Sequence, residues 1–132
     1  MHEGGPQALS PDAVVLVPGL GLGPEAWAPT ASRLRYGDRV LVPCLPGFGV
    51  PGRGEDLHPR ALAERLLEVV GSSPRRMVVA GHSASCQVAA HVAVLAGDRV
   101  TGLVLVGPTT DPRARATTPL AGPWWGRPAP AP

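Results

Sequence analysis

Residues 77–85 read Met-Val-Val-Ala-Gly-His-Ser-Ala-Ser, an apolar run that ends in a turn of small residues. The apolar run predicts a buried strand, and the segment from about 84 to 96, closed by Gly97, predicts a helix. A sharp strand–turn–helix with serine at its apex holds the hydroxyl clear of the sheet, where a base and a substrate can reach it. Ser83 is therefore a candidate nucleophile.

The turn around Ser83 is crowded, so it needs small residues two before and two after the serine. Gly81 and Ser85 meet that need, although glycine is usual at the second position. The helix after the turn directs the positive end of its dipole at the turn, which favours an oxyanion that develops there. The alternative is a glycine-assisted helix start without chemistry.

Outward from this turn, strands and helices alternate along the chain. Apolar runs predict strands at 13–17, 39–42, 77–80 and 100–106. Helices are predicted after Pro24, with Trp27, Ala31 and Leu34 on one face, and over 59–70, with a stripe of Leu62, Leu66, Val69 and Val70. This alternation predicts an α/β fold, a mostly parallel sheet of about four strands with helices on both faces. Binding sites in such sheets form at the carboxyl ends of the strands.

A chain of 132 residues accommodates one domain. We expect a flexible arm over 1–11, the α/β domain over 12–112, and a Pro/Ala/Gly-rich disordered tail over 113–132, where hydrophobic periodicity is lost.

Composition excludes several classes of function. The net charge of +2 is spread along the chain without a basic stripe, so nucleic acid is not an expected partner. The longest apolar runs are about five residues, too short to span a membrane, and no signal peptide is visible. Cys44 and Cys86 have no metal-ligand spacing and are interpreted as small buried apolar residues, which favours a cytoplasmic protein without a bound metal.

Over residues 12–112 the chain resembles the α/β-hydrolase fold family in four stretches that occur in the expected order. Val14 to Gly19, with Trp27 eight residues later, is similar to the oxyanion-loop region, although Pro18 departs from a frequent His-Gly pair. Leu45 to Gly49 is similar to the Pro-Gly-(Phe/His)-Gly loop, with Cys44 where aspartate is usual. Gly81-His82-Ser83 matches the nucleophile turn, and Asp98 to Pro108 is similar to the next strand.

The resemblance implies that Ser83 attacks the acyl carbon of a small-molecule acyl or ester substrate, without a metal or an organic cofactor. It also implies an oxyanion hole formed by the backbone N–H groups of Leu20 and Ala84. The candidate pocket residues are Gly19, His82 and Asp111.

The triad implied by the family runs in the order serine, acid, histidine. The sequence holds only His2, His58, His82 and His91, and His91 lies about 12 Å along the same helix from Ser83. We interpret His58 as a helix cap, His82 as a packing residue and His91 as structural. A truncated hydrolase is therefore expected, without the family's acid, histidine and last strands, and we expect association through the unpaired sheet edge.

Two alternatives remain at this point. The first keeps the fold but denies activity, as an inert fragment or pseudoenzyme. The second is a Rossmann-type nucleotide-binding domain, because Gly19, Gly21 and Gly23 follow a strand and precede a helix. Pro24 departs from that fingerprint, and the acidic ribose partner is missing where Cys44 stands.

Overall fold

The computed structural model describes residues 10–108. Residues 1–9 and 109–132 lie outside the described part; they include most of the predicted arm, the whole predicted tail and Asp111. The described residues form a four-stranded parallel sheet and a separate two-stranded parallel ladder. The predicted α/β class and the parallel sheet are confirmed.

The elements follow one another as the sequence pattern predicts. In chain order they are β1 (Ala13–Val17), η1 (Pro24–Trp27), α1 (Ala28–Ala31), η2 (Gly37–Arg39), β2 (Val40–Leu41), β3 (Leu45–Pro46), β4 (Gly49–Val50), α2 (Pro59–Val70), β5 (Met77–His82), α3 (Ser85–Ala96), η3 (Gly97–Arg99) and β6 (Val100–Val106). The main sheet has the order β2-β1-β5-β6.

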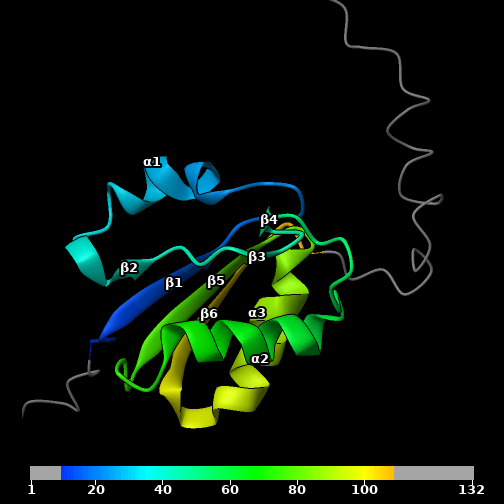
Figure 1. The fold of residues 1–132 in the computed structure, drawn as a ribbon. Helices are drawn as coiled ribbons and strands as arrows, with labels where there is room; N and C mark the ends of the chain where they lie inside the picture. The colour runs from blue at the N-terminus through cyan, green and yellow to red at the C-terminus, as the bar shows by residue number, and fades with distance from the viewer. Residues whose placement is uncertain (1–9, 109–132) are drawn as a thin grey trace, which may run out of the picture.

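Helices cover both faces of the sheet, with α1 on one side and α2 and α3 on the other (Figure 1). Every residue of β1 is buried. Val15 and Val17 face the larger core beneath α2 and α3, whereas Val14 and Leu16 face the smaller core beneath α1. A continuous apolar run therefore forms this strand because both of its faces are covered.

The face of the sheet opposite α2 and α3 is covered by the short segment that contains η1 and α1. The predicted helix after Pro24 is a 3-10 turn followed by only four α-helical residues. Trp27, Ala31 and Leu34 pack from this segment against the smaller core, as predicted. A helix this short offers no extended N-terminus for a phosphate, so the Rossmann interpretation of the glycine-rich turn gains no support.

Helix α2 begins and ends at the predicted residues. The His58 side chain caps it by accepting a hydrogen bond from the Arg60 N–H through Nδ1 at 3.2 Å. Leu62 and Leu66 are buried as predicted, but Val69 is 67% exposed and Ala63 takes its place in the core. At about 100° per residue, Leu62, Leu66, Val70 and Ala63 span an arc of about 100°, and Val69 lies about 20° beyond the edge of that arc that Leu62 marks.

Three smaller expectations need correction. Arg39 belongs to the 3-10 turn η2, so the second strand spans only Val40–Leu41. The turn-rich stretch after it contains the β3–β4 ladder. Cys44 is exposed because it lies in the loop after β2, whereas Cys86 is buried as predicted.

Strand β6 lies at one end of the described sheet, and its side chains are open on both faces. Leu103, Val104, Leu105 and Val106 are each between 40% and 48% exposed. Association through this edge stays a prediction. None of the helices within residues 10–108 is long and apolar enough to span a membrane.

Asp12 joins the N-terminal ends of the adjacent strands β1 and β5. Its carboxylate accepts hydrogen bonds from the backbone N–H groups of Arg75 and Arg76 at 3.1 and 3.0 Å, and it pairs with the Arg76 guanidinium at 3.3 Å. The backbone hydrogen bond from Arg76, followed by the charge of its side chain, lowers the pKa of Asp12 despite partial desolvation.

Acid should remove the contribution of Asp12 to stability. Because its pKa is lower in the folded chain than in the unfolded chain, the stabilisation is present above the ordinary carboxyl range and is lost as pH falls through the folded pKa. Asp12→Ala should therefore lower the free energy of unfolding at about pH 7 and change it little near about pH 2. Urea titrations at both pH values test this, with the exposed Asp38→Ala as control. An equal loss at both values would contradict the assignment.

Helix α2 offers a matched pair of substitutions that tests which face is buried. Leu66→Ala should lower the free energy of unfolding by about 2–5 kcal/mol, because it leaves a cavity under a fully buried side chain. Val69→Ala should change it by less than about 0.5 kcal/mol, because that side chain is exposed. Chemical denaturation followed by circular dichroism measures both, and comparable losses would show that the helix is rotated from this arrangement.

Candidate functional site

The predicted site residues lie where the direction of the chain across the sheet reverses. From β1 the chain moves outward through α1 to β2, and then returns through α2 to β5, which pairs with the other side of β1. The loops after β1 and β5 therefore leave neighbouring strands at a topological switch point, where open α/β sheets bind their ligands. In Figure 1 the loop after β1, the β3–β4 ladder and the start of α3 gather at the same end of the sheet.

Ser83 has the backbone conformation that a nucleophile turn requires. Its φ is +55°, and within residues 10–108 it is the only non-glycine residue with positive φ. Such a conformation costs about 1–3 kcal/mol and persists only where surrounding contacts hold it. In this turn the Ser83 N–H donates to the Val106 carbonyl at 2.9 Å, and the Ser83 carbonyl accepts from the Cys86 N–H at 3.1 Å.

Gly81 lets the helix begin directly behind the strand. A Cβ at this position would lie 2.7 Å from the Ser85 carbonyl oxygen and 2.8–2.9 Å from backbone atoms of Cys86. These atoms belong to the first turn of α3 and cannot rotate away as a side chain would. The predicted need for a small residue two before the serine is thus explained by backbone packing.

Ser85 fills the second small position and adds a hydrogen-bonding role that size alone does not reveal. It is fully buried. Its Oγ accepts from the His82 N–H at 2.8 Å and lies 2.9 Å from the Val17 carbonyl oxygen and 3.0 Å from that of His82, either of which can accept its proton. The departure from glycine therefore creates a polar contact between the β5 turn and the end of β1.

In the loop after β1, the backbone N–H of Leu20 does not donate to another backbone group of the loop. The Gly21 N–H donates to the Gly47 carbonyl at 2.8 Å, and the Leu22 N–H donates to the Gly19 carbonyl at 3.0 Å. In the described part of the chain, the N–H groups of Leu20 and Ala84 make none of these turn, loop or cap hydrogen bonds. Both residues proposed for the oxyanion hole thus keep their donors available.

The two loops are in contact through His82 and Gly19. A Cβ on Gly19 would lie 2.9 Å from Nδ1 of His82, so the imidazole covers the glycine. His82 therefore packs against the loop that carries Leu20. Gly19 and His82, both predicted to line a pocket, are brought together, whereas Asp111 lies outside the described residues.

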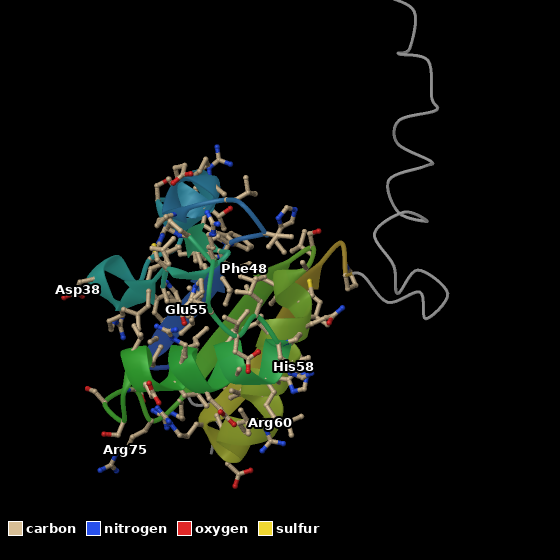
Figure 2. All side chains as sticks on the ribbon, turned by 45° about the vertical axis from the view of Figure 1, so that its right-hand side comes forward. Asp38, Phe48, Glu55, His58, Arg60 and Arg75 are labelled. Atoms are coloured by element: carbon tan, nitrogen blue, oxygen red, sulfur yellow. The ribbon has the colours of Figure 1, made fainter. Side chains whose placement is uncertain are left out.

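Apolar side chains surround this end of the molecule. Leu20 is 62% exposed and Leu57 is 45% exposed, and both flank Gly47, whose φ is +79°. Phe48, labelled in Figure 2, is buried in the larger core. Leu20 and Leu57 therefore offer exposed apolar surface beside the loop after β1, which suits an apolar portion of a ligand.

The described histidines have partners away from Ser83. The ring of His58 caps α2 and meets the ring of His91 edge-on, with centroids 6.0 Å apart. Figure 2 shows His58 beside Arg60 at the start of α2, on the opposite side of the molecule from Arg75. These contacts agree with the structural roles predicted for His58 and His91. The histidine contacts described above for residues 10–108 are to Arg60, to Gly19 and to each other, and none is to the Ser83 hydroxyl.

Cys86 is a further titratable group close to the turn. Burial raises the pKa of the Cys86 thiol, whose Sγ lies 3.5 Å from the Val106 carbonyl oxygen. It remains a neutral thiol and packs as a small apolar residue. Groups of three or more His, Cys, Asp or Glu side chains that could hold a metal ion are absent from the described part of the chain.

Comparison with known proteins gives one family match and several relatives with a common name. The alpha/beta hydrolase family model matches residues 14–132. Pimeloyl-(acyl-carrier protein) methyl ester esterase of Aromatoleum aromaticum is 39% identical over 114 residues, which is 84% of this chain and 42% of the relative. The enzymes of that name from Vibrio atlanticus and Vibrio campbellii are 34% and 33% identical, over 70% and 83% of this chain and 35% and 41% of the relatives. The chain thus spans about two fifths of the length of these relatives.

Among the described glycines without a positive φ, Gly81 is the one whose substitution by alanine should disrupt the backbone most. We expect a loss of about 3 kcal/mol or more in the free energy of unfolding, because backbone atoms obstruct the new Cβ. Gly102→Ala is the matched control, since its Cβ would meet only the Val78 side chain, at 3.2 Å. Denaturant titration measures both variants, and a Gly81→Ala chain as stable as the control would show that α3 does not begin this close to β5.

Proposed function

The chain belongs to the alpha/beta hydrolase family, and from that premise we propose that Ser83 is the nucleophile of an ester-hydrolysing site. The observation that carries this proposal is the positive φ of Ser83 at the apex of a strand–turn–helix, with Gly81 packed against the helix backbone. Strained non-glycine residues of this kind concentrate at active sites, because strain is retained where geometry matters more than stability.

The proposed reaction has two steps. The Ser83 Oγ bonds to the carbonyl carbon of the ester, and its proton passes through a base to the alcohol oxygen as the carbon–oxygen bond breaks. The products are a free alcohol and an acyl-serine. Water then attacks the acyl carbon, returns a proton to Ser83 Oγ and releases a carboxylic acid.

Charge that develops on the carbonyl oxygen needs two donors. We assign these to the backbone N–H groups of Leu20 and Ala84, which take no part in the turn and loop hydrogen bonds around them. Donors fixed before the reaction cost no reorganisation in the transition state, and each contributes about 10²–10³-fold to rate. The N-terminus of α3, directly after Ala84, adds its dipole.

The substrate class is inferred from the relatives and from the surface. The relatives are named for the hydrolysis of a methyl ester of an acyl group on a carrier protein. The exposed Leu20 and Leu57 beside the loop after β1 suit the apolar part of an acyl ester. We therefore propose a carboxylic ester with an apolar acyl portion as the substrate of this chain.

A second candidate, an inert member of the same family, rests on the histidines. Those of the described residues cap α2, pack against Gly19 or pair with another histidine, and none reaches the Ser83 hydroxyl. A missing general base costs about 10²–10⁴-fold in rate. Donors and binding can still leave measurable catalysis over water when a triad member is removed.

We expect a fluorophosphonate probe to label Ser83 slowly in the purified chain, and free imidazole to accelerate the labelling. The reason is that the nucleophile and the oxyanion donors are assembled, whereas no described histidine supplies the base. The acceleration should be about tenfold or more, within the range of general-base effects. Intact mass spectrometry monitors the reaction, and peptide mapping locates the label.

Ser83→Ala should abolish the labelling, and Ser73→Ala, which removes an exposed hydroxyl of the same kind, should retain it. Equal labelling of the Ser83→Ala chain would mean that another residue reacts. A folded chain that stays unlabelled with imidazole present would favour the inert alternative over the proposed hydrolase.

A further inference from the structure

Ser85 joins two segments of the chain that are distant in sequence. Its Oγ lies 2.9 Å from the carbonyl oxygen of Val17, the last residue of β1, and accepts at 2.8 Å from the N–H of His82, the last residue of β5. The Ser85 side chain is fully buried, so water does not compete for these groups. The single proton of this hydroxyl is shared between the Val17 carbonyl and the His82 carbonyl, which lies 3.0 Å away, so the hydroxyl contacts the ends of two neighbouring strands.

The position of this contact matters because each of the two strands leads directly into one of the proposed oxyanion donors. Val17 is three residues before Leu20, and His82 is two residues before Ala84. A second contact, between the His82 imidazole and Gly19, lies between the same two loops. Beyond the pairing of β1 with β5, which extends to Val17 and Gly81, the two loops are therefore joined by the Ser85 hydroxyl and by the packing of the His82 ring on Gly19.

We propose that Ser85 is a positioning residue, whose hydroxyl sets the spacing between the Leu20 and Ala84 N–H groups around Ser83. This inference rests on the proposed function and adds a role that the small size of the residue does not imply. Alanine would fit the site but would remove the contacts of the hydroxyl to the ends of both strands. Glycine, usual at this position of the motif, would remove the same contacts.

The test uses a thiol in place of the reacting hydroxyl, so that it needs no base and no known substrate. Ser83→Cys is made in a Cys44→Ser background, because Cys44 is exposed, while the buried Cys86 remains. The rate of alkylation by iodoacetamide is measured against pH, and its midpoint reports the pKa of the thiol introduced by Ser83→Cys. Thiols near helix N-termini and backbone N–H donors ionise at lower pH than free cysteine.

Adding Ser85→Ala should raise this midpoint by about one pH unit and slow alkylation at neutral pH about tenfold, because the donors no longer converge on the sulfur. Val92→Ala is the control for stability, since it removes buried atoms about two turns further along α3. Ser73→Ala is the control for loss of a hydroxyl. All variants are compared under conditions where circular dichroism shows them folded.

A midpoint that rises with Ser85→Ala and with neither control supports the positioning role. An unchanged midpoint, or an equal rise with Val92→Ala, overturns it. If Ser85→Ala does not fold, Ser85→Gly and Ser85→Cys replace it: glycine should raise the midpoint, and cysteine, which keeps a weak donor, should raise it less. Equal midpoints for the two replacements would overturn the proposal.

The two measurements separate this proposal from the hydrolase assignment. Fluorophosphonate labelling of the parent chain tests whether Ser83 acts as a nucleophile. The alkylation midpoint of the Ser83→Cys chain tests whether Ser85 organises the donors. Absent labelling together with a Ser85-dependent midpoint would refute hydrolysis by this chain and retain the positioning role. Labelling that is equal in rate with and without Ser85→Ala would refute the positioning role alone.

Discussion

The contact on which the site depends is the approach of the α3 backbone to Gly81. Only a residue without a side chain permits it, because the Ser85 carbonyl and the Cys86 backbone lie within 2.7–2.9 Å of where a Cβ would stand. At the apex of this tight turn Ser83 has a positive φ, and its N–H donates a hydrogen bond to the Val106 carbonyl. It also fixes where α3 begins, and so places Val88 and Val92 in the core against the sheet. The same close packing thus serves both stability and site geometry.

The order of the strands brings the loop after β1 beside the turn that carries Ser83. Because β1 and β5 are adjacent and parallel, with Val17 opposite Gly81, the loops after them emerge side by side. The Ser85 hydroxyl then contacts Val17 at the end of β1, and the His82 ring packs on Gly19 in the loop that follows. A rearrangement of the sheet order would separate Leu20 from Ala84 even if both loops kept their local shape. The site is therefore a property of topology as much as of the motif around Ser83.

Local patterns predicted the parts of the fold that local physics controls. Proline and glycine bound α2 at Pro59 and Gly71, and the continuous apolar run of β1 matches a strand covered on both faces. The expectation for Val69 was wrong because periodicity identifies an apolar stripe but not the angle at which the sheet meets it. For Ser85 the sequence predicted only its size, since its partner Val17 lies 68 residues away. The proposed oxyanion donors follow only from the resemblance, because backbone N–H groups leave no trace in side-chain identity.

Proton transfer and charge stabilisation are supplied by separate parts of such a site, and the described residues offer candidates only for charge stabilisation. The backbone donors and the strained serine depend on β1, β5, β6 and α3, all of which are present. A base would have to approach Ser83 from the open side of the turn, but His58 and His91 are engaged with each other and His82 lies on Gly19. A preorganised oxyanion site acts on the transition state whether the proton leaves through a histidine or through solvent. The geometry around Ser83 can therefore be tested independently of the base.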